Sequence, residues 1–229
     1  MKRIIIFLLA FFPLLAVMQC TTDKTPLEKA AEQGDAKAQY QLGDLLMKGD
    51  SVERDTARAI YWYKRAAEQE YAPAQKELGN CYLDGIGVEK DYTRAFNLYQ
   101  KAAKQGYAPA QFNLALCYAN GEGVEKDLNR TVYWLEKAAE QGDAKAQRKV
   151  GSYYYVGKGV RKNLSRAAYW WEKAAEQGLA EAQFNLGGCY YYGVGVEKDL
   201  KRAAYWWEKA AEQGLEMAKT ALKEIENGQ

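Results

Sequence analysis

The sequence predicts an all-α solenoid, a stack of antiparallel helix pairs that repeats every 36 residues. Ala-Gln recurs five times at this interval, from Ala38 and Gln39 to Ala182 and Gln183, and Ala-Ala keeps the same step from Ala30 onward. A constant period without insertions indicates one small unit copied along the chain. Stacked units bury a core that no single unit buries alone. We therefore expect five 36-residue repeats with a capping helix at each end.

The first helix of each unit is expected to begin near one of five alanines: Ala36, Ala72, Ala108, Ala144 and Ala180. Apolar side chains then follow helical spacing, as in Ala74, Leu78 and Tyr82. Glycine recurs inside this helix, as at Gly79, where it costs about 1 kcal/mol relative to alanine. Its recurrence predicts a close helix-to-helix approach. The helix should end at a Gly-x-Gly-Val turn, whose first glycine, such as Gly85, suits a left-handed C-cap.

The second helix of each unit should follow an Asp or Asn N-cap, at Asp55, Asp91, Asp127, Asn163 and Asp199. Large side chains are expected on its inward face, at Trp62 and Tyr63, Trp134, Trp170 and Trp171, and Trp206 and Trp207. Glu-Gln-Gly then closes the helix. Unit one departs from the pattern, because Ser51 replaces the second loop glycine and Glu70 the closing one. The two caps are expected at Leu27 to Gln33 and at Glu216 to Glu226.

Residues 1–19 are predicted to be a signal peptide. Lys2 and Arg3 precede an apolar run from Ile4 to Met18 that is shorter than the roughly 20 apolar residues of a membrane helix. Residues 20–25 would form a tether before a solenoid of residues 26–226. Cys20 follows the apolar run as in a lipoprotein signal, although Gln19 stands where a small residue is usual. We expect an exported protein, periplasmic or anchored to the outer membrane by lipidation of Cys20, with simple secretion as the alternative.

The charge balance argues against a nucleic-acid partner. Removing Lys2 and Arg3 from the 32 basic residues leaves 30, which equals the 30 acidic residues. A nucleic-acid binder normally carries a basic surplus. Any contact with a membrane is expected only through the lipid anchor at Cys20.

The remaining cysteines are predicted to be buried thiols. Cys81, Cys117 and Cys189 occupy equivalent repeat positions, about 10 Å or more apart in stacked helix pairs. A disulfide needs Cα atoms within about 7 Å, so we expect none. No histidine and no Cys-x-x-Cys pair is present, and we expect no zinc or other metal.

Catalytic signatures are missing from the sequence. There is no histidine for a general base, and the three serines (Ser51, Ser152 and Ser165) lie in no hydrolase or penicillin-binding motif. The Gly-x-Gly loops follow helices and lack the lysine and serine of a phosphate-binding loop. We therefore predict no enzyme activity, no catalytic residue and no cofactor.

The pattern resembles the Sel-one-like repeat family, a relative of the tetratricopeptide repeat. The matching runs are Ala74 to Tyr82, Gly85 to Asp91 and Ala167 to Ala175, and the resemblance extends over residues 26 to 226. It implies a right-handed superhelix and adaptor or scaffold roles. For some cysteine-rich relatives, the resemblance implies β-lactam binding. Those relatives carry paired cysteines in each unit, whereas this chain has at most one cysteine in each unit.

In the tetratricopeptide relatives the first helices line the concave face. Carried onto this chain, the lining positions lie one, five, eight and nine residues after each Ala-Gln, and they vary between units while core positions do not. We expect a peptide or protein partner, of unknown identity, to bind an apolar-aromatic surface over units three to five, because exposed aromatic residues favour interface centres. The candidate residues are Phe112, Leu116, Asn120, Arg148, Tyr155, Phe184, Tyr191 and Tyr192. The alternative is that these tyrosines are partly buried between units and contact no partner.

Three functions remain open from the sequence. The favoured one is a non-enzymatic interaction scaffold of the bacterial cell envelope. The second is a binder of cell-wall or β-lactam-type ligands, or a weak hydrolase. The third is a secreted effector that engages a host protein.

Overall fold

The protein, seen here in a computed structural model, is described for residues 24–49 and 53–227, and over these ranges it contains twelve α-helices and no strand. The predicted signal peptide (residues 1–19), Cys20 and Ser51 lie outside the described residues. The first helices of the five units are α2 (Ala36–Lys48), α4 (Ala72–Asp84), α6 (Ala108–Asn120), α8 (Ala144–Val156) and α10 (Ala180–Tyr192). The second helices are α3 (Thr56–Glu68), α5 (Tyr92–Lys104), α7 (Leu128–Glu140), α9 (Leu164–Glu176) and α11 (Leu200–Glu212). The caps are α1 (Pro26–Glu32) and α12 (Glu216–Asn227).

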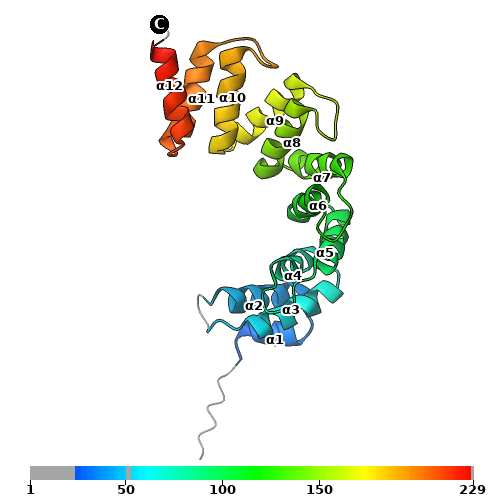
Figure 1. The fold of residues 1–229 in the computed structure, drawn as a ribbon. Helices are drawn as coiled ribbons and strands as arrows, with labels where there is room; N and C mark the ends of the chain where they lie inside the picture. The colour runs from blue at the N-terminus through cyan, green and yellow to red at the C-terminus, as the bar shows by residue number, and fades with distance from the viewer. Residues whose placement is uncertain (1–23, 50–52, 228–229) are drawn as a thin grey trace, which may run out of the picture.

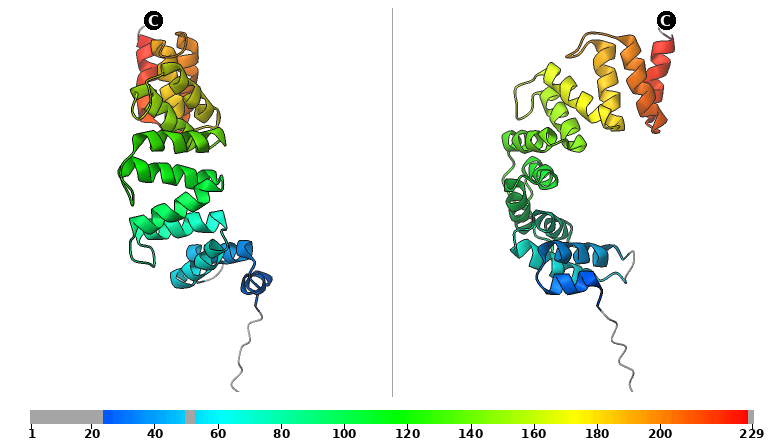
Figure 2. Two further views of the ribbon diagram at one scale, coloured as in Figure 1. Left: turned by 90° about the vertical axis from the view of Figure 1, so that its right-hand side faces the viewer. Right: turned by 180° about the vertical axis from the view of Figure 1, so that it is seen from behind.

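The helices stack into an open arc, with the N-terminal units at one end and α12 at the other (Figure 1). Each helix packs against the next one along the chain. In the middle of the arc α4 and α6 lie on the inner side, whereas α5 and α7 lie on the outer side (Figures 1 and 2). The all-α solenoid predicted from the period is therefore confirmed.

Helix ends follow the residues that the sequence analysis identified. Each predicted Asp or Asn N-cap accepts a hydrogen bond from the backbone N–H three residues ahead, as Asp91 does from Arg94 at 2.9 Å. Each first helix of the five units ends at a glycine with φ between 72° and 81°, a left-handed C-cap. At the closing turn of unit one Glu70 takes φ 60°, so the chain keeps the turn even without glycine.

The glycines inside the first helices contact large side chains of the second helices. A Cβ added to Gly79 would lie 2.6 Å from the Tyr99 ring, and one added to Gly151 would lie 2.7 Å from the Trp171 ring. The close approach predicted from these glycines is present. Real Cβ atoms do not come this near to other heavy atoms, so the aromatic ring occupies the space that a side chain would need.

A ladder of glutamines joins consecutive units, and it explains why Ala-Gln recurs. Gln147 is 5% exposed, and its Nε2 donates to the Ala139 carbonyl at the end of the preceding unit. Its Oε1 accepts a hydrogen bond from Gln177 Nε2 at 2.8 Å, from the end of its own unit. The same two contacts recur at the other four glutamines of the series: Gln39, Gln75, Gln111 and Gln183. Buried amides of this kind need partners, and here the repeat supplies them.

Not every predicted core position is equally buried. Trp62 and Trp170 are each 8% exposed, whereas Trp134 and Trp206 are only partly buried. Cys81, Cys117 and Cys189 are buried free thiols, as expected for small apolar side chains. Among the described helices, none is long and apolar enough to cross a membrane.

Candidate peptide-binding groove

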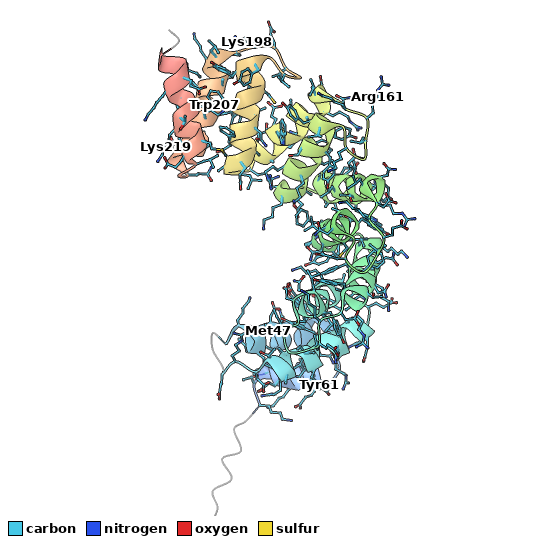
Figure 3. The ribbon with its side chains drawn as sticks, viewed as in Figure 1. Met47, Tyr61, Arg161, Lys198, Trp207 and Lys219 are labelled. Carbon is cyan, nitrogen blue, oxygen red and sulfur yellow. The ribbon has the colours of Figure 1, made fainter. Side chains whose placement is uncertain are left out.

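The inner side of the arc changes character from the N-terminal units to the C-terminal units. Figure 3 shows Met47, one of the expected lining residues, facing into the arc, while Tyr61 of the second helix faces away from it. The residue five positions after each Ala-Gln differs in every unit, in the order Asp44, Asn80, Leu116, Ser152 and Gly188. The side chain at this position forms part of the inner surface above the second helix, where Tyr63, Tyr99, Trp171 and Trp207 are all buried.

In units one and two the variable position is polar and binds the ring below it. The Tyr63 hydroxyl donates to Asp44 Oδ1 at 2.7 Å, and the Tyr99 hydroxyl donates to Asn80 Oδ1 at 2.7 Å. Burial raises the pKa of Tyr63 and Tyr99 well above the usual phenol value, so both hydroxyls stay protonated and able to donate. These contacts cover the rings and leave a polar surface.

In units four and five a tryptophan replaces that tyrosine, and its hydrogen-bond acceptor is a backbone carbonyl instead of a side chain. Trp171 Nε1 donates to the Arg148 carbonyl at 3.1 Å, and Trp207 Nε1 donates to the Phe184 carbonyl at 3.0 Å. Because the backbone satisfies the indole N–H, no polar side chain is needed above it. Ser152 and Gly188 stand at the variable position here, and a Cβ on Gly188 would meet nothing within 4 Å.

These substitutions open a groove of about 720 Å³ between α8, α10 and α12, with a mainly apolar lining. Cavities of this size are typical of ligand sites. Its lining residues are Ser152, Tyr155, Val156, Trp171, Phe184, Asn185, Gly188, Cys189, Tyr192, Val194, Trp207, Met217, Thr220, Ala221 and Glu224.

Aromatic rings in mutual contact form the walls of the groove. Phe184 stacks on Trp207 with ring centroids 6.2 Å apart, and Tyr155 lies 5.4 Å from Trp171. Tyr192 is 69% exposed and Tyr155 is 43% exposed, so both present ring surface to solvent. Centroid distances of this size lie in the favoured range for contacts between aromatic rings.

Cys189 contributes to the groove as an apolar group. It is 3% exposed, and burial raises the pKa of its thiol to about 12. The thiol is therefore neutral at physiological pH, and it lacks the thiolate that nucleophilic chemistry requires. Among the described residues no cluster of three or more His, Cys, Asp or Glu side chains is arranged to hold a metal ion.

The groove brings together only part of the predicted set. Tyr155, Phe184 and Tyr192 line it, whereas Tyr191 packs behind Tyr192 and against Trp207 at 5.2 Å. Phe112 is partly buried against the core, and neither Leu116 nor Asn120 reaches the groove lining. Arg148 contributes its carbonyl to Trp171 and to Ser152 and does not line the groove. The groove thus lies over units four and five and the cap, rather than over units three to five, and a binding role for any of these residues stays a prediction.

Sequence reasoning missed two contributors. Trp171 and Trp207 are buried in the core as predicted, but both also border the groove, which the sequence analysis did not anticipate. The helix α12 was expected only as a terminal cap, yet it supplies Thr220 and Glu224 to the groove. Both residues follow Phe184 and Gly188 by one period, so extending the lining pattern by 36 residues finds them.

Comparison with known proteins places these features in a family. The family model described as Sel1 repeat matches residues 27–35, 36–71, 72–107, 108–143, 144–179 and 180–215. No curated protein matches the chain.

Solved structures from bacteria share the fold. One, a protective antigen present in uropathogenic Escherichia coli strains and displaying an SLR fold, is 36% identical with a TM-score of 0.84; the match covers 87% of this chain and 43% of that one. A Sel1 repeat protein from Oxalobacter formigenes is 37% identical with a TM-score of 0.75, over 84% of this chain and 77% of that chain. An immunity protein from Pseudomonas aeruginosa is 28% identical with a TM-score of 0.51, over 80% of this chain and 67% of that chain.

This chain therefore spans less than half the length of the Escherichia coli protein. Sel1 repeat proteins are generally non-enzymatic scaffolds that bind other proteins. Since the family model matches an unbroken series of repeats from residue 27 to residue 215, the chain belongs to the Sel1 repeat family.

Proposed function

We propose that this protein is a non-enzymatic scaffold of the bacterial cell envelope that binds a peptide segment of another protein in the groove between α8, α10 and α12. The observation that carries the proposal is the mainly apolar groove walled by Tyr155, Phe184 and Tyr192, which is left open where Ser152 and Gly188 stand at the variable position. Rigid aromatic side chains in a partly closed groove are the usual centres of binding energy in protein interfaces.

The proposed envelope location does not depend on the groove. It is based on Lys2 and Arg3, the apolar run that follows them and Cys20. The related protein described as a protective antigen of Escherichia coli is consistent with an exposed location. Labelling with a radioactive fatty acid, compared with the Cys20→Ser variant, tests the anchor, and equal labelling of the two proteins would exclude it.

The groove is tested by filling it. Gly188→Trp adds a large side chain in open space, and Asn97→Trp adds the same side chain on the outer surface, where other units carry tyrosine. Proteins captured from an envelope extract by the full chain should be lost with Gly188→Trp and kept with Asn97→Trp. Equal capture by both variants would contradict the proposal.

Two single alanine variants locate the contact further. Phe184→Ala removes a groove wall, whereas Phe112→Ala changes a side chain outside the groove. We expect Phe184→Ala alone to abolish capture, with both variants checked for helical circular dichroism and cooperative unfolding. Loss with Phe112→Ala and retention with Phe184→Ala would place the interface on unit three instead.

A further inference from the structure

The loop between α8 and α9 differs in charge from the equivalent loops of the other units. Glu-Lys-Asp or Glu-Arg-Asp precedes the second helix in four units, but unit four has Arg161, Lys162 and Asn163. Lys158 and Arg166 lie in the same stretch, and no acidic residue occurs between Gly157 and Arg166. Unit four therefore carries a concentrated positive charge that the repeat pattern does not require.

Most of this charge is free of partners inside the described part of the chain. Arg166 contacts Glu136 at 3.8 Å and also the Tyr154 hydroxyl, so it is already engaged. Lys158, Arg161 and Lys162 are exposed and take part in no ion pair with a described residue. Arg161 stands at the edge of the molecule on this loop (Figure 3).

The basic loop adjoins the groove at its α8 side. Lys162 Nζ lies 5.9 Å from the centroid of the Tyr155 ring, and Tyr155 lines the groove. Val160, Arg161 and Lys162 also border a separate hollow of about 380 Å³, together with Tyr154. A chain that leaves the groove past Tyr155 would therefore meet Lys162 first, with Arg161 next to it in the loop.

The opposite side of the groove carries the opposite charge. Glu224 of α12 lines it, and it is the one charged side chain among the lining residues. The groove thus has an acidic group on its α12 side and basic groups beyond its α8 side. Complementary charges at the rim determine which partner docks and in which orientation.

We infer that the segment bound in the groove is an acidic-flanked apolar peptide, with aromatic or aliphatic side chains against Tyr155, Phe184 and Tyr192 and carboxylates against Lys158, Arg161 and Lys162. This inference rests on the proposed function, because it names the chemistry of the peptide that the groove would bind. Exposed charge pairs are screened within about 8 Å at physiological salt, so the acidic residues must lie next to the apolar anchors in the partner's sequence.

A displayed random-peptide library selected on the full chain tests the inference, with the Gly188→Trp protein used to remove peptides that bind elsewhere. We expect the enriched sequences to carry Asp or Glu beside an apolar core. Enrichment of apolar cores with no acidic bias, or with a basic one, would overturn this inference and leave the proposed function standing. No enrichment above the Gly188→Trp protein would contradict both.

A synthetic copy of the most enriched peptide then tests the loop itself. The double variant Arg161→Glu with Asn163→Asp carries the residues that the other four units have at these positions, so it is expected to fold normally. The affinity of this variant for the peptide should be about fivefold or more below that of the original protein at low salt, since each exposed ion pair is worth up to about 1 kcal/mol. Glu89→Arg with Asp91→Asn, which places the basic loop in unit two, should leave the affinity unchanged. Equal affinities for all three proteins would overturn the inference.

Discussion

Gly187 lies directly against the indole ring of Trp207, so close that a Cβ at position 187 would come within 2.5 Å of the ring nitrogen. The same relationship joins Gly43 to Tyr63 in unit one. In unit three both partners change together, since Ala115 and Leu135 occupy the equivalent positions. A smaller side chain on the second helix leaves room for a Cβ on the first, and this is the reason that alanine is accepted only there.

Adjacent glycines in α10 should respond oppositely to alanine. Gly187→Ala forces a Cβ into the Trp207 ring and should lower the free energy of unfolding by about 1–3 kcal/mol. Gly188→Ala places its Cβ in open space and should raise it by about 0.5–1 kcal/mol, because glycine weakens a helix interior. Urea denaturation of the two variants gives the comparison. A similar loss in both would mean that backbone flexibility, rather than packing, controls this helix.

The alanine and leucine pair of unit three should be replaceable by the glycine and tryptophan pair of units four and five. Leu135→Trp alone overfills the space beside Ala115 and should cost about 1–3 kcal/mol. With Ala115→Gly the indole fits, and by analogy with Trp171 and Trp207 its N–H is expected to reach the Phe112 carbonyl. A double-mutant cycle should give a favourable coupling above about 1 kcal/mol. Simple additivity of the two changes would contradict the packing argument.

Within each pair of the glutamine ladder, the buried glutamine should contribute more to the free energy of unfolding than the exposed one. Gln147→Ala leaves the Ala139 carbonyl and the Gln177 amide without their partner, at a cost of about 1–3 kcal/mol. Gln177 is exposed, so water can replace its contacts and Gln177→Ala should cost less than Gln147→Ala. Thermal unfolding of both variants ranks them. The reverse order would show that the buried amide is not the junction between units.

Stability should decline at alkaline pH through the buried thiols. Burial raises the pKa of Cys81 to about 11 and that of Cys117 and Cys189 to about 12, from an ordinary value of 9.0. Above pH 9 the unfolded chain releases these protons while the folded chain retains them, so the free energy of unfolding is full below pH 9 and falls toward pH 11 and 12.

Urea midpoints at about pH 8 and pH 10 measure this decline, with each group contributing about 1.4 kcal/mol per pH unit at most. Cys117→Ala should reduce the difference between the two midpoints. A decline that is the same size in the variant would exclude Cys117 as a contributor, and a decline that also persists without Cys81 and Cys189 would assign the effect to the buried tyrosines Tyr63 and Tyr99, whose pKa values burial also raises.

Much of the fold could be predicted because its determinants are local and repeated. The N-caps, the glycine C-caps and the 36-residue period each depend on residues close together in the sequence, and every unit repeats them. The glutamine ladder was visible as a recurrent Ala-Gln, but its role was not. Its partners lie 8 and 30 residues away, and only the packed structure shows which atoms they are.

The candidate groove was predicted only in part, for a related reason. Exposed aromatic residues at Tyr155, Phe184 and Tyr192 followed from the lining pattern, but Phe112 and Tyr191 obey the same pattern and lie outside the groove. Whether a lining residue borders open space depends on its neighbours in the packed structure, since Asp44 binds the Tyr63 hydroxyl whereas a Cβ on Gly188 would meet nothing within 4 Å.

The sequence alone determined the class of this protein: a solenoid of helix pairs with the cap residues, the period and the repeats of the Sel1 family. These follow from local conformational preferences that each unit restates. Only the tertiary structure decided where the inner surface opens, because that depends on whether Tyr63 or Trp207 stands below the variable position and on which atom satisfies its donor. An indole N–H that binds the backbone frees the residue above it to be glycine, and the groove exists because two successive units use that arrangement.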